Sequence, residues 1–401
     1  MNNRSLYFLV FFSFLLKLPV CCQIDTQKLF ILGNSTIDHR PPAQPVPSDE
    51  TTVPHWIYLL ALEANQTFAA GGQYGFLTQF DDFNWFSQWG YDIVPASWDD
   101  ENQTFAEADH SSLMITTANF IQYKSPSQNH PLDQNTSVVA ATEIILDHAE
   151  DLDPALNYYL YQNWPEMDLA DAFPPNVPSD LEVNDFHNLT SGSYHNWWLN
   201  YQDQLLSSRP ELNIRLIPVG EILAKIQRDL LPNQIPFEDL YEDSAPHGTS
   251  NLYFLSGLIC YMALYETEAP ELTLPDLIHP VIQDNYDLIR DFIWNELLLF
   301  NLANGDSRVF NNNLVNSSET NYRTDHFKVY PNPSRGQLMV SGIKPGSKLS
   351  IYNSHGHLIQ TACASDSVHQ IDISKTPAGI YIIQSYNEKM NLFLTSRFVK
   401  D

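Results

Sequence analysis

The segment that most constrains the fold is an apolar run ending in a small polar turn, Leu29-Phe-Ile-Leu-Gly33-Asn34-Ser35-Thr36. A continuous apolar run of this length is typical of a buried strand in a parallel sheet. Active sites of open α/β sheets lie beyond the carboxyl ends of such strands. Ser35 therefore stands where a nucleophilic hydroxyl would be presented. Gly-Asn-Ser is also ordinary turn chemistry, so the hypothesis depends on a base and an oxyanion site elsewhere in the chain.

Strand-like and helix-like segments alternate from residue 24 to about residue 303. Strands are expected at Leu29–Leu32, Leu113–Thr117, Tyr158–Tyr161 and Ile214–Pro218. Helices are expected at Val53–Ala64, Val138–Ala149, Tyr194–Leu206, Glu221–Leu231, Leu252–Tyr265 and about Ile282–Leu302. Alternation of this kind predicts a parallel sheet with helices on both faces.

The N-terminal residues read as a secretory signal peptide. Arg4 precedes an apolar run over residues 6–16, and we expect residues 1–23 to be removed on export. The run is too short to span a bilayer, and no later segment is long and apolar enough, so no membrane span is expected. Of four cysteines, Cys260 and Cys363 follow the signal and stand far apart, which excludes a disulfide framework.

The net charge of −28 is distributed unevenly. Residues 326–401 hold eight Lys/Arg and four Asp/Glu, a balance of +4, so residues 1–325 carry −32. An acidic body of this kind repels nucleic acid, anionic membranes and polyanionic glycans. Nucleic acid is therefore not an expected partner, and a neutral substrate fits better than a sulfated or uronic one.

The C-terminal part differs in texture from the body. Residues 304–325 are polar and aperiodic, which predicts a linker. Short alternating strands follow over residues 326–401 and predict a small all-β sandwich. Its start, Val329-Tyr-Pro-Asn-Pro333, and its later Pro377-Ala-Gly-Ile-Tyr381 resemble the C-terminal sorting domain of the type IX secretion system. The resemblance implies recognition of residues 326–401 by that machinery and a secreted or cell-surface location, reached through the periplasm.

A candidate base for Ser35 stands near the end of the body. His247 lies between Pro246 and Gly248, directly before an apolar helix, and Glu242 and Asp243 precede it closely. Serine becomes a strong nucleophile when a histidine removes its proton and a carboxylate orients that histidine. The alternative is that His247 is a loop histidine with only a structural role.

Two segments offer donors for an oxyanion. A glycine turn expected at Gly71-Gly72-Gln-Tyr-Gly75 could present backbone N–H groups in addition to the Ser35 amide. Asn119 follows the strand at Leu113–Thr117, where its side-chain amide could donate to the same oxygen. A glycine pair is usually only a turn, and a strand-end Asn is usually a cap.

The order of Ser35, glycine turn, Asn119 and His247 resembles the SGNH (GDSL-like) hydrolase family over residues 27 to about 265. The resemblance implies a flavodoxin-like three-layer sandwich and a serine esterase. Ser35 would be the nucleophile, His247 the base and Asp243 the orienting acid, with the Ser35 N–H, Gly72 N–H and Asn119 forming the oxyanion hole. Asp243 stands four residues before His247 where the family has three, so Glu242 remains an alternative acid, as Gly71 and Gly75 remain alternatives to Gly72.

Other candidates are weaker. Trp164 follows the strand at Tyr158–Tyr161 and could stack on a sugar ring, although core packing is the commoner role of such a residue. Asp38 and His39 are interpreted as ordinary polar residues of a loop. No repeated His, Asp or Glu spacing suggests a metal, and no cofactor is expected.

These observations predict a secreted serine esterase, with a carbohydrate acetylesterase as the favoured subtype on family analogy. Three alternatives remain open. They are a lipid or aryl esterase on the same triad, a non-catalytic surface glycan-binding protein on the same fold, and a metal-dependent deacetylase. The acyl group and the glycan are not specified by the sequence.

Overall fold

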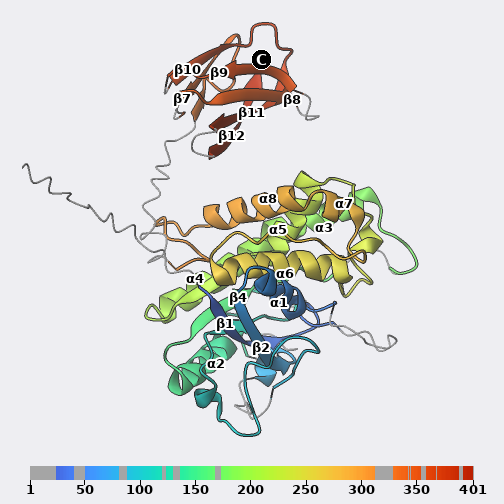
Figure 1. The fold of residues 1–401 in the computed structure, drawn as a ribbon, viewed down its shortest axis with the longest axis vertical. Helices are drawn as coiled ribbons and strands as arrows, with labels where there is room; N and C mark the ends of the chain where they lie inside the picture. The colour runs from blue at the N-terminus through green and yellow to red at the C-terminus, as the bar shows by residue number, and fades with distance from the viewer. Residues whose placement is uncertain are drawn as a thin grey trace, which may run out of the picture. The chain divides into compact units, whose positions relative to one another are not determined.

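The computed structural model describes residues 24–39, 50–80, 88–119, 123–129, 136–167 and 173–311, and in the C-terminal part residues 328–341, 343, 345–353, 358–366, 368–387 and 392–400. The expected signal peptide, residues 1–23, lies outside these ranges. The chain divides into two compact units, residues 1–315 (the body) and 316–401 (the tail unit). Each is described by itself (Figure 1).

A five-stranded parallel sheet forms the centre of the body. Its strands are β1 (Thr26–Gly33), β2 (Thr67–Tyr74), β3 (Ser112–Ile115), β4 (Asn157–Tyr161) and β5 (Ile214–Ile217), in the order β2-β1-β3-β4-β5. This is the doubly wound order of flavodoxin-like sheets, in which the chain reverses direction across the sheet beside β1. The predicted parallel α/β architecture is confirmed.

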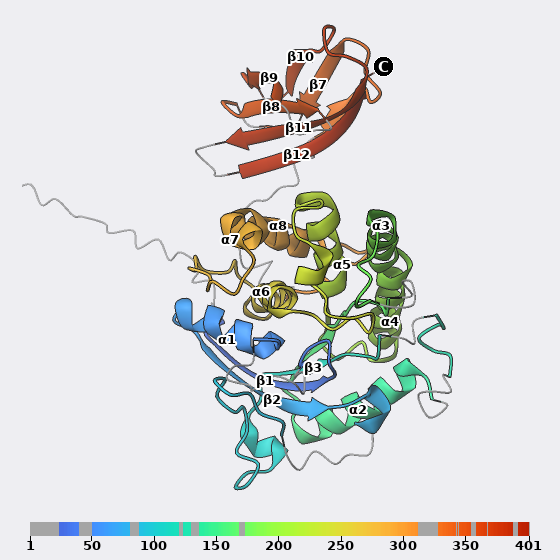
Figure 2. The same cartoon turned by 90° about the vertical axis from the view of Figure 1, so that its right-hand side faces the viewer.

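Helices cover both faces of the sheet (Figure 2). Along β1, Leu29 and Ile31 pack into one core with the helices α1 (Val53–Glu63), α5 (Val219–Lys225), α6 (Ser250–Tyr265) and α8 (Tyr286–Leu299). Phe30 and Leu32 pack into a second core with α2 (Val138–Leu152) and α4 (His195–Ser208). Successive side chains of a strand point to opposite faces, so a strand buried on both faces must be apolar at every position. This explains the unbroken apolar run that the sequence shows.

The α-helices are α1 (Val53–Glu63), α2 (Val138–Leu152), α3 (Asp180–Leu189), α4 (His195–Ser208), α5 (Val219–Lys225), α6 (Ser250–Tyr265), α7 (Pro280–Asp284) and α8 (Tyr286–Leu299). Short 3-10 turns lie at Leu77–Gln79, Phe105–Ala108 and Phe237–Asp239, and π-helical segments at Thr190–Tyr194 and Ile226–Leu230. The sequence pattern did not predict α3. A capping box begins it, because Ser179 and Glu182 satisfy each other's backbone N–H groups.

The expected glycine turn at residues 71–75 is mostly strand. Gly71 and Gly72 lie inside β2, in register with Phe30 and Ile31 of β1. A Cβ atom at Gly72 would lie 2.1 Å from the Ile31 carbonyl oxygen, and one at Gly71 would lie 2.0 Å from Oε1 of Gln88. These glycines therefore permit a close approach of backbone and side chains, a use of glycine that a sequence pattern does not separate from a turn.

The body continues past residue 303, where the linker was expected to begin. Val309 and Phe310 are buried, and the Leu216 N–H donates to the Arg308 carbonyl at 2.9 Å. The polar residues from Asn304 to Ser307 form a turn that returns the chain to the sheet. Burial of two apolar side chains after that turn outweighs the polar composition of the segment.

The tail unit is a pair of antiparallel sheets. One has the order β10-β7-β6 and the other β12-β11-β8-β9. The strands are β6 (Lys328–Tyr330), β7 (Gln337–Ser341), β8 (Lys348–Asn353), β9 (Leu358–Cys363), β10 (Val368–Asp372), β11 (Gly379–Asn387) and β12 (Leu392–Lys400). Their inward residues, among them Leu338, Ile351 and Ile383, form a separate core. The expected C-terminal antiparallel β structure is confirmed.

Candidate active site

Ser35 lies in a tight turn directly after β1. The amides of Ile37 and Asp38 donate to the Asn34 carbonyl at 2.9 and 3.1 Å. The Asn34 side chain accepts from the Thr36 amide at 3.0 Å and donates to the Thr117 carbonyl beyond β3 at 3.1 Å. Asn34 therefore fixes the turn and joins the carboxyl ends of β1 and β3, while the Ser35 side chain stays partly exposed.

His247 lies in a loop that closes on itself before α6. The Glu242 N–H donates to the His247 carbonyl at 2.8 Å, and the Thr249 N–H donates to the Leu240 carbonyl at 2.9 Å. The hydroxyl of Tyr253, in the first turn of α6, donates to the Ser35 carbonyl. The start of α6 thereby connects the histidine loop to the turn that holds Ser35.

Three consecutive carbonyls of this loop are bound by residues that follow β3 and β4. The Met167 amide donates to Ser244 at 3.1 Å. The Asn119 side chain donates to Ala245 at 3.1 Å, and the indole N–H of Trp164 donates to Pro246 at 2.8 Å. The loop is held by the sheet as well as by its own turn, which gives the His247 ring a defined position.

Asp243 is the carboxylate that contacts His247. Its Oδ2 lies 2.8 Å from the ring Nδ1, and its Oδ1 accepts from the backbone N–H groups of His247 and Ala245 at 3.0 Å each. Desolvation acts to raise the pKa of Asp243, but the hydrogen bonds from His247 and Ala245 outweigh it and the net pKa lies below the usual value. The carboxylate is thus held in its ionised form beside the imidazole.

Glu242, the alternative acid, contacts a different histidine. Its Oε2 lies 3.2 Å from Nε2 of His39, and the His39 ring stacks on the His247 ring with centroids 3.9 Å apart and planes 6° apart. From the sequence, His39 was expected to be only a polar loop residue. The available signal was a pair of adjacent acids, Glu242 and Asp243, which can serve two histidines at once.

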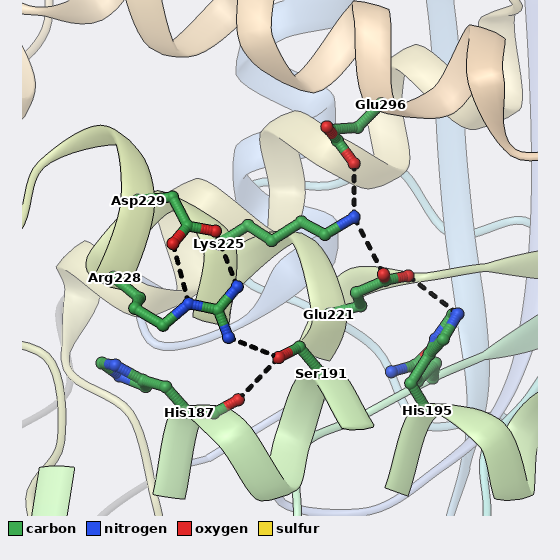
Figure 3. Close-up of polar contacts among 9 residues, drawn as sticks. His187, Ser191, His195, Glu221, Lys225, Arg228, Asp229 and Glu296 are labelled. Carbon is green, nitrogen blue, oxygen red and sulfur yellow. Dashed lines mark hydrogen bonds and ion pairs between the residues drawn. The ribbon is translucent and has the colours of Figure 1, made fainter. Parts of the chain in front are cut away.

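A second His–carboxylate pair is more deeply buried and has a different environment (Figure 3). The Nε2 atom of His195 lies 2.9 Å from Glu221, and its Nδ1 lies 2.8 Å from Oε1 of Gln162. Lys225 bridges Glu221 at 2.9 Å and Glu296 at 2.6 Å. Both ring nitrogens of His195 are occupied, so this ring cannot take a proton from a substrate hydroxyl or a serine without breaking a contact.

His247 differs from His195 in this respect. Its Nδ1 takes the carboxylate, and its Nε2 has no hydrogen-bond partner among the residues that the structure describes. In a serine triad the acid likewise fixes one ring nitrogen of the histidine and leaves the other for the nucleophile. Within the described part of the chain, the Ser35 hydroxyl also makes no hydrogen bond, to His247 or to any other residue. Catalytic hydrogen bonds are often long or poorly aligned until the substrate binds.

The candidate oxyanion donors differ in availability. The Gly72 N–H donates to the Trp89 carbonyl at 3.2 Å, and the Gly75 N–H donates to the Gly33 carbonyl at 2.8 Å. The Ser35 amide donates to no residue in the described ranges. The Asn119 side-chain amide has two N–H hydrogens, and one of them donates to the Ala245 carbonyl. Ser35 and Asn119 therefore each have an N–H group available for an oxyanion, whereas the N–H groups of Gly72 and Gly75 already donate to backbone carbonyls.

Trp164 is fully buried. Its ring packs edge-on against Tyr253 at 6.3 Å, and its indole N–H supports the histidine loop. A buried ring offers no face on which a sugar could stack, so Trp164 supports the site from behind. The described residues contain no group of three or more His, Cys, Asp or Glu arranged to hold a metal ion.

The comparisons with known proteins characterise the tail unit. Residues 328–400 match the family model described as the secretion system C-terminal sorting domain. Among solved structures, PorZ, a surface component of the type IX secretion system of Porphyromonas gingivalis, is 19% identical with a TM-score of 0.19. That match covers 21% of this chain and only 12% of the length of PorZ.

Matches that include the body are more distant. A crystal structure that is 10% identical, with a TM-score of 0.33, covers 60% of this chain and 98% of its own. An engineered protein is 10% identical with a TM-score of 0.20 and covers 93% of both chains. No curated protein matches the chain. These similarities are too low to support an argument about the body.

No helix in the described ranges has the length and apolar character needed to cross a membrane. The family match concerns the tail unit alone and identifies its role in protein sorting. Residues 328–400 are a secretion system C-terminal sorting domain, which interacts with the type IX secretion machinery and makes this a secreted or cell-surface protein.

Proposed function

We propose that the body is a secreted serine esterase of the SGNH type, with Ser35 as nucleophile, His247 as base and Asp243 as the orienting acid. One observation carries the proposal. The Asp243 carboxylate, fixed by two backbone N–H groups, holds Nδ1 of His247 at 2.8 Å in a loop tied to the carboxyl ends of the sheet. A parallel α/β sheet binds its ligands at that edge.

In the proposed reaction, Ser35 Oγ attacks the ester carbonyl carbon while His247 Nε2 takes the hydroxyl proton. The carbonyl π electrons move to oxygen, and the Ser35 amide and the second N–H of Asn119 stabilise that oxyanion. The tetrahedral intermediate expels the alcohol, which receives the proton from His247, and leaves an acyl-Ser35. Water, deprotonated by His247, then releases the carboxylic acid and restores the serine.

The Gly72 amide can join the oxyanion hole only if its bond to the Trp89 carbonyl opens. Two donors are sufficient for the proposal, because a single preorganised donor already contributes about 10²–10³-fold to the rate. We infer that Asp243 serves as the acid and Glu242 does not, since Glu242 contacts His39.

A fluorophosphonate probe tests the nucleophile directly. We expect the full wild-type chain to be labelled at Ser35 and to release acetate from acetylated neutral glycans. Ser35→Ala should abolish both signals with an unchanged thermal melt. Ser191→Ala is a matched control, because Ser191 lies in the π-helical segment and its hydroxyl bonds the His187 carbonyl and Arg228. Absence of labelling together with absence of ester hydrolysis would overturn the proposal and favour a non-catalytic glycan-binding body. Loss of activity on chelation would favour a metal-dependent deacetylase.

A further inference from the structure

Exposed aromatic side chains gather at the carboxyl ends of β1 and β2, beside the turn that holds Ser35. Tyr74, the last residue of β2, is 53% exposed and Trp89 is 45% exposed. Their ring centroids lie 6.1 Å apart. Both rings, with Tyr91, line a small open hollow that also includes Gly33, Asn34, Ile37, Asp38 and Gln73.

The backbone at both residues is fixed by contacts within the sheet. Trp89 exchanges two backbone hydrogen bonds with Gly72, and Tyr74 lies opposite Gly33 in the register of the sheet. A large apolar side chain fixed in an exposed position gives up favourable burial, and such positions commonly mark contact sites. Aromatic rings offer a rigid contact area at low entropic cost.

The position of the hollow relates it to the candidate nucleophile. Asn34 and Ile37 contribute to its lining, and Ser35 stands between them in the same turn. A ligand on the aromatic residues would therefore lie beside the turn that holds Ser35, within the same region of the sheet edge as the candidate nucleophile.

The chemistry of the lining favours a ligand with both apolar and hydroxyl faces. Asp38, which is buried, and the half-buried Gln73 add polar character to the lining beside the aromatic residues. A carboxylate disfavours a hydrocarbon chain, because burying its charge against an apolar surface costs free energy. It also repels an anionic ligand, as does the −32 charge of residues 1–325. A neutral pyranose ring meets both conditions: its C–H face can stack on the exposed Tyr74 or Trp89, and its hydroxyls suit a polar, uncharged group such as the half-buried Gln73 amide.

We propose that Tyr74 and Trp89 form a subsite for a neutral sugar ring next to Ser35. This inference rests on the proposed function for its catalytic consequence, but binding of the sugar does not require catalysis. It assigns to these residues the stacking role for which the sequence offered Trp164 as a possible candidate.

The first test measures binding without turnover. Titration calorimetry of the full-length Ser35→Ala chain should detect unesterified neutral oligosaccharides, such as xylo- or cello-oligosaccharides. The added change Trp89→Ala should weaken that binding about tenfold or more. Tyr330→Ala, which removes a 44% exposed aromatic from the tail unit, should leave it unchanged. The backbone bonds of Trp89 survive the substitution, and a thermal melt verifies the fold.

The second test uses kinetics and separates the ligand classes. For an acetylated neutral oligosaccharide, Trp89→Ala and Tyr74→Ala should raise KM about tenfold. The rate with ethyl acetate, which is too small to reach both rings and Ser35, should change less than about twofold, since the rate machinery is untouched. Trp89→Phe should restore most of the affinity.

Several results would overturn the subsite. They are no binding of neutral oligosaccharides to Ser35→Ala, tighter binding of uronic oligosaccharides than of neutral ones, equal losses on both esters, or a KM effect confined to long-chain acyl esters. If wild-type protein hydrolyses no ester yet the Ser35→Ala chain binds neutral oligosaccharides through Trp89, the esterase proposal fails and the subsite stands.

Discussion

Replacing Asp243 by Asn tests how the candidate base is oriented. The Asn carbonyl oxygen can still accept the two backbone N–H groups that Asp243 Oδ1 accepts at 3.0 Å, so the loop should keep its shape. The amide nitrogen would replace Oδ2, which lies 2.8 Å from His247 Nδ1. A donor at that position favours the tautomer with its proton on Nε2, and such a ring cannot accept the Ser35 proton.

The expected loss is large because the wrong tautomer disables the base. In a serine triad the same change lowers kcat by about 10⁴-fold, which corresponds to about 5.4 kcal/mol at 1.36 kcal/mol per tenfold. We expect Asp243→Asn to lower kcat for acetyl ester hydrolysis by about 10³–10⁴-fold. The loss of stability should be small, about 1–2 kcal/mol, because the Asp243 side chain is 37% exposed and solvent screens its charge.

Glu242→Gln is the matched control. It makes the same change of charge one residue away, but the Glu242 carboxylate contacts His39 at 3.2 Å and not His247. Initial rates of acetate release and rates of fluorophosphonate labelling, measured for both variants across pH, compare the two acids. We expect the kcat of Glu242→Gln to stay within about tenfold of the wild-type value. A tenfold change corresponds to about 1.4 kcal/mol, which is less than the free energy of one hydrogen bond to a charged group. Equal losses in the two variants would show a general charge effect, and a larger loss in Glu242→Gln would refute the orientation argument.

Three further predictions concern stability. Trp164→Phe leaves the buried Pro246 carbonyl without its 2.8 Å donor, so urea unfolding should show a loss of about 1–3 kcal/mol, with activity lowered through the loosened histidine loop. Gly257→Ala places a Cβ 2.5 Å from that of Trp56 between α6 and α1, and calorimetry should show a cost of about 1–3 kcal/mol from overpacking. Desolvation, together with the charge of Lys28, lowers the pKa of His110 to about 4. The unfolded chain binds this proton near pH 6.5, so the stability contribution is complete above that pH and is lost toward pH 4, by about 1.4 kcal/mol per pH unit at most. Urea midpoints at pH 7 and pH 5 should therefore converge in His110→Gln; an unchanged pH dependence would contradict the assignment.

The sequence predicts much of the architecture because the burial of a strand determines which residue types it contains. β1 is buried on both faces, and so its residues are apolar at every position from Leu29 to Leu32. The errors occur where tertiary contacts outweigh local pattern. Gly71 and Gly72 look like a turn but occupy an edge strand, and residues 308–310 follow a polar segment yet return to the core.

The candidate site was located by the sequence but not resolved by it. Spacing alone leaves Glu242 and Asp243 equivalent, since both are close enough in the chain to reach His247. The fold separates them, because the turn after Asp243 directs its carboxylate to Nδ1 of His247 while His39 receives Glu242. His39 is separated from that loop by about two hundred residues, and no local pattern encodes such a meeting.

By itself, the sequence determined the alternating α/β body, the buried strand that precedes Ser35, and the sorting signal of the tail, because periodicity and short motifs are local properties of the chain. Only the tertiary structure decided which acid faces His247, which amides remain available beside Ser35, and which aromatic rings are exposed. Trp164 and Trp89 show the difference: one is buried behind the histidine loop, and the other is exposed at the hollow beside β1 and β2. Burial depends on what the rest of the chain packs against a residue, and that is settled only when distant segments meet.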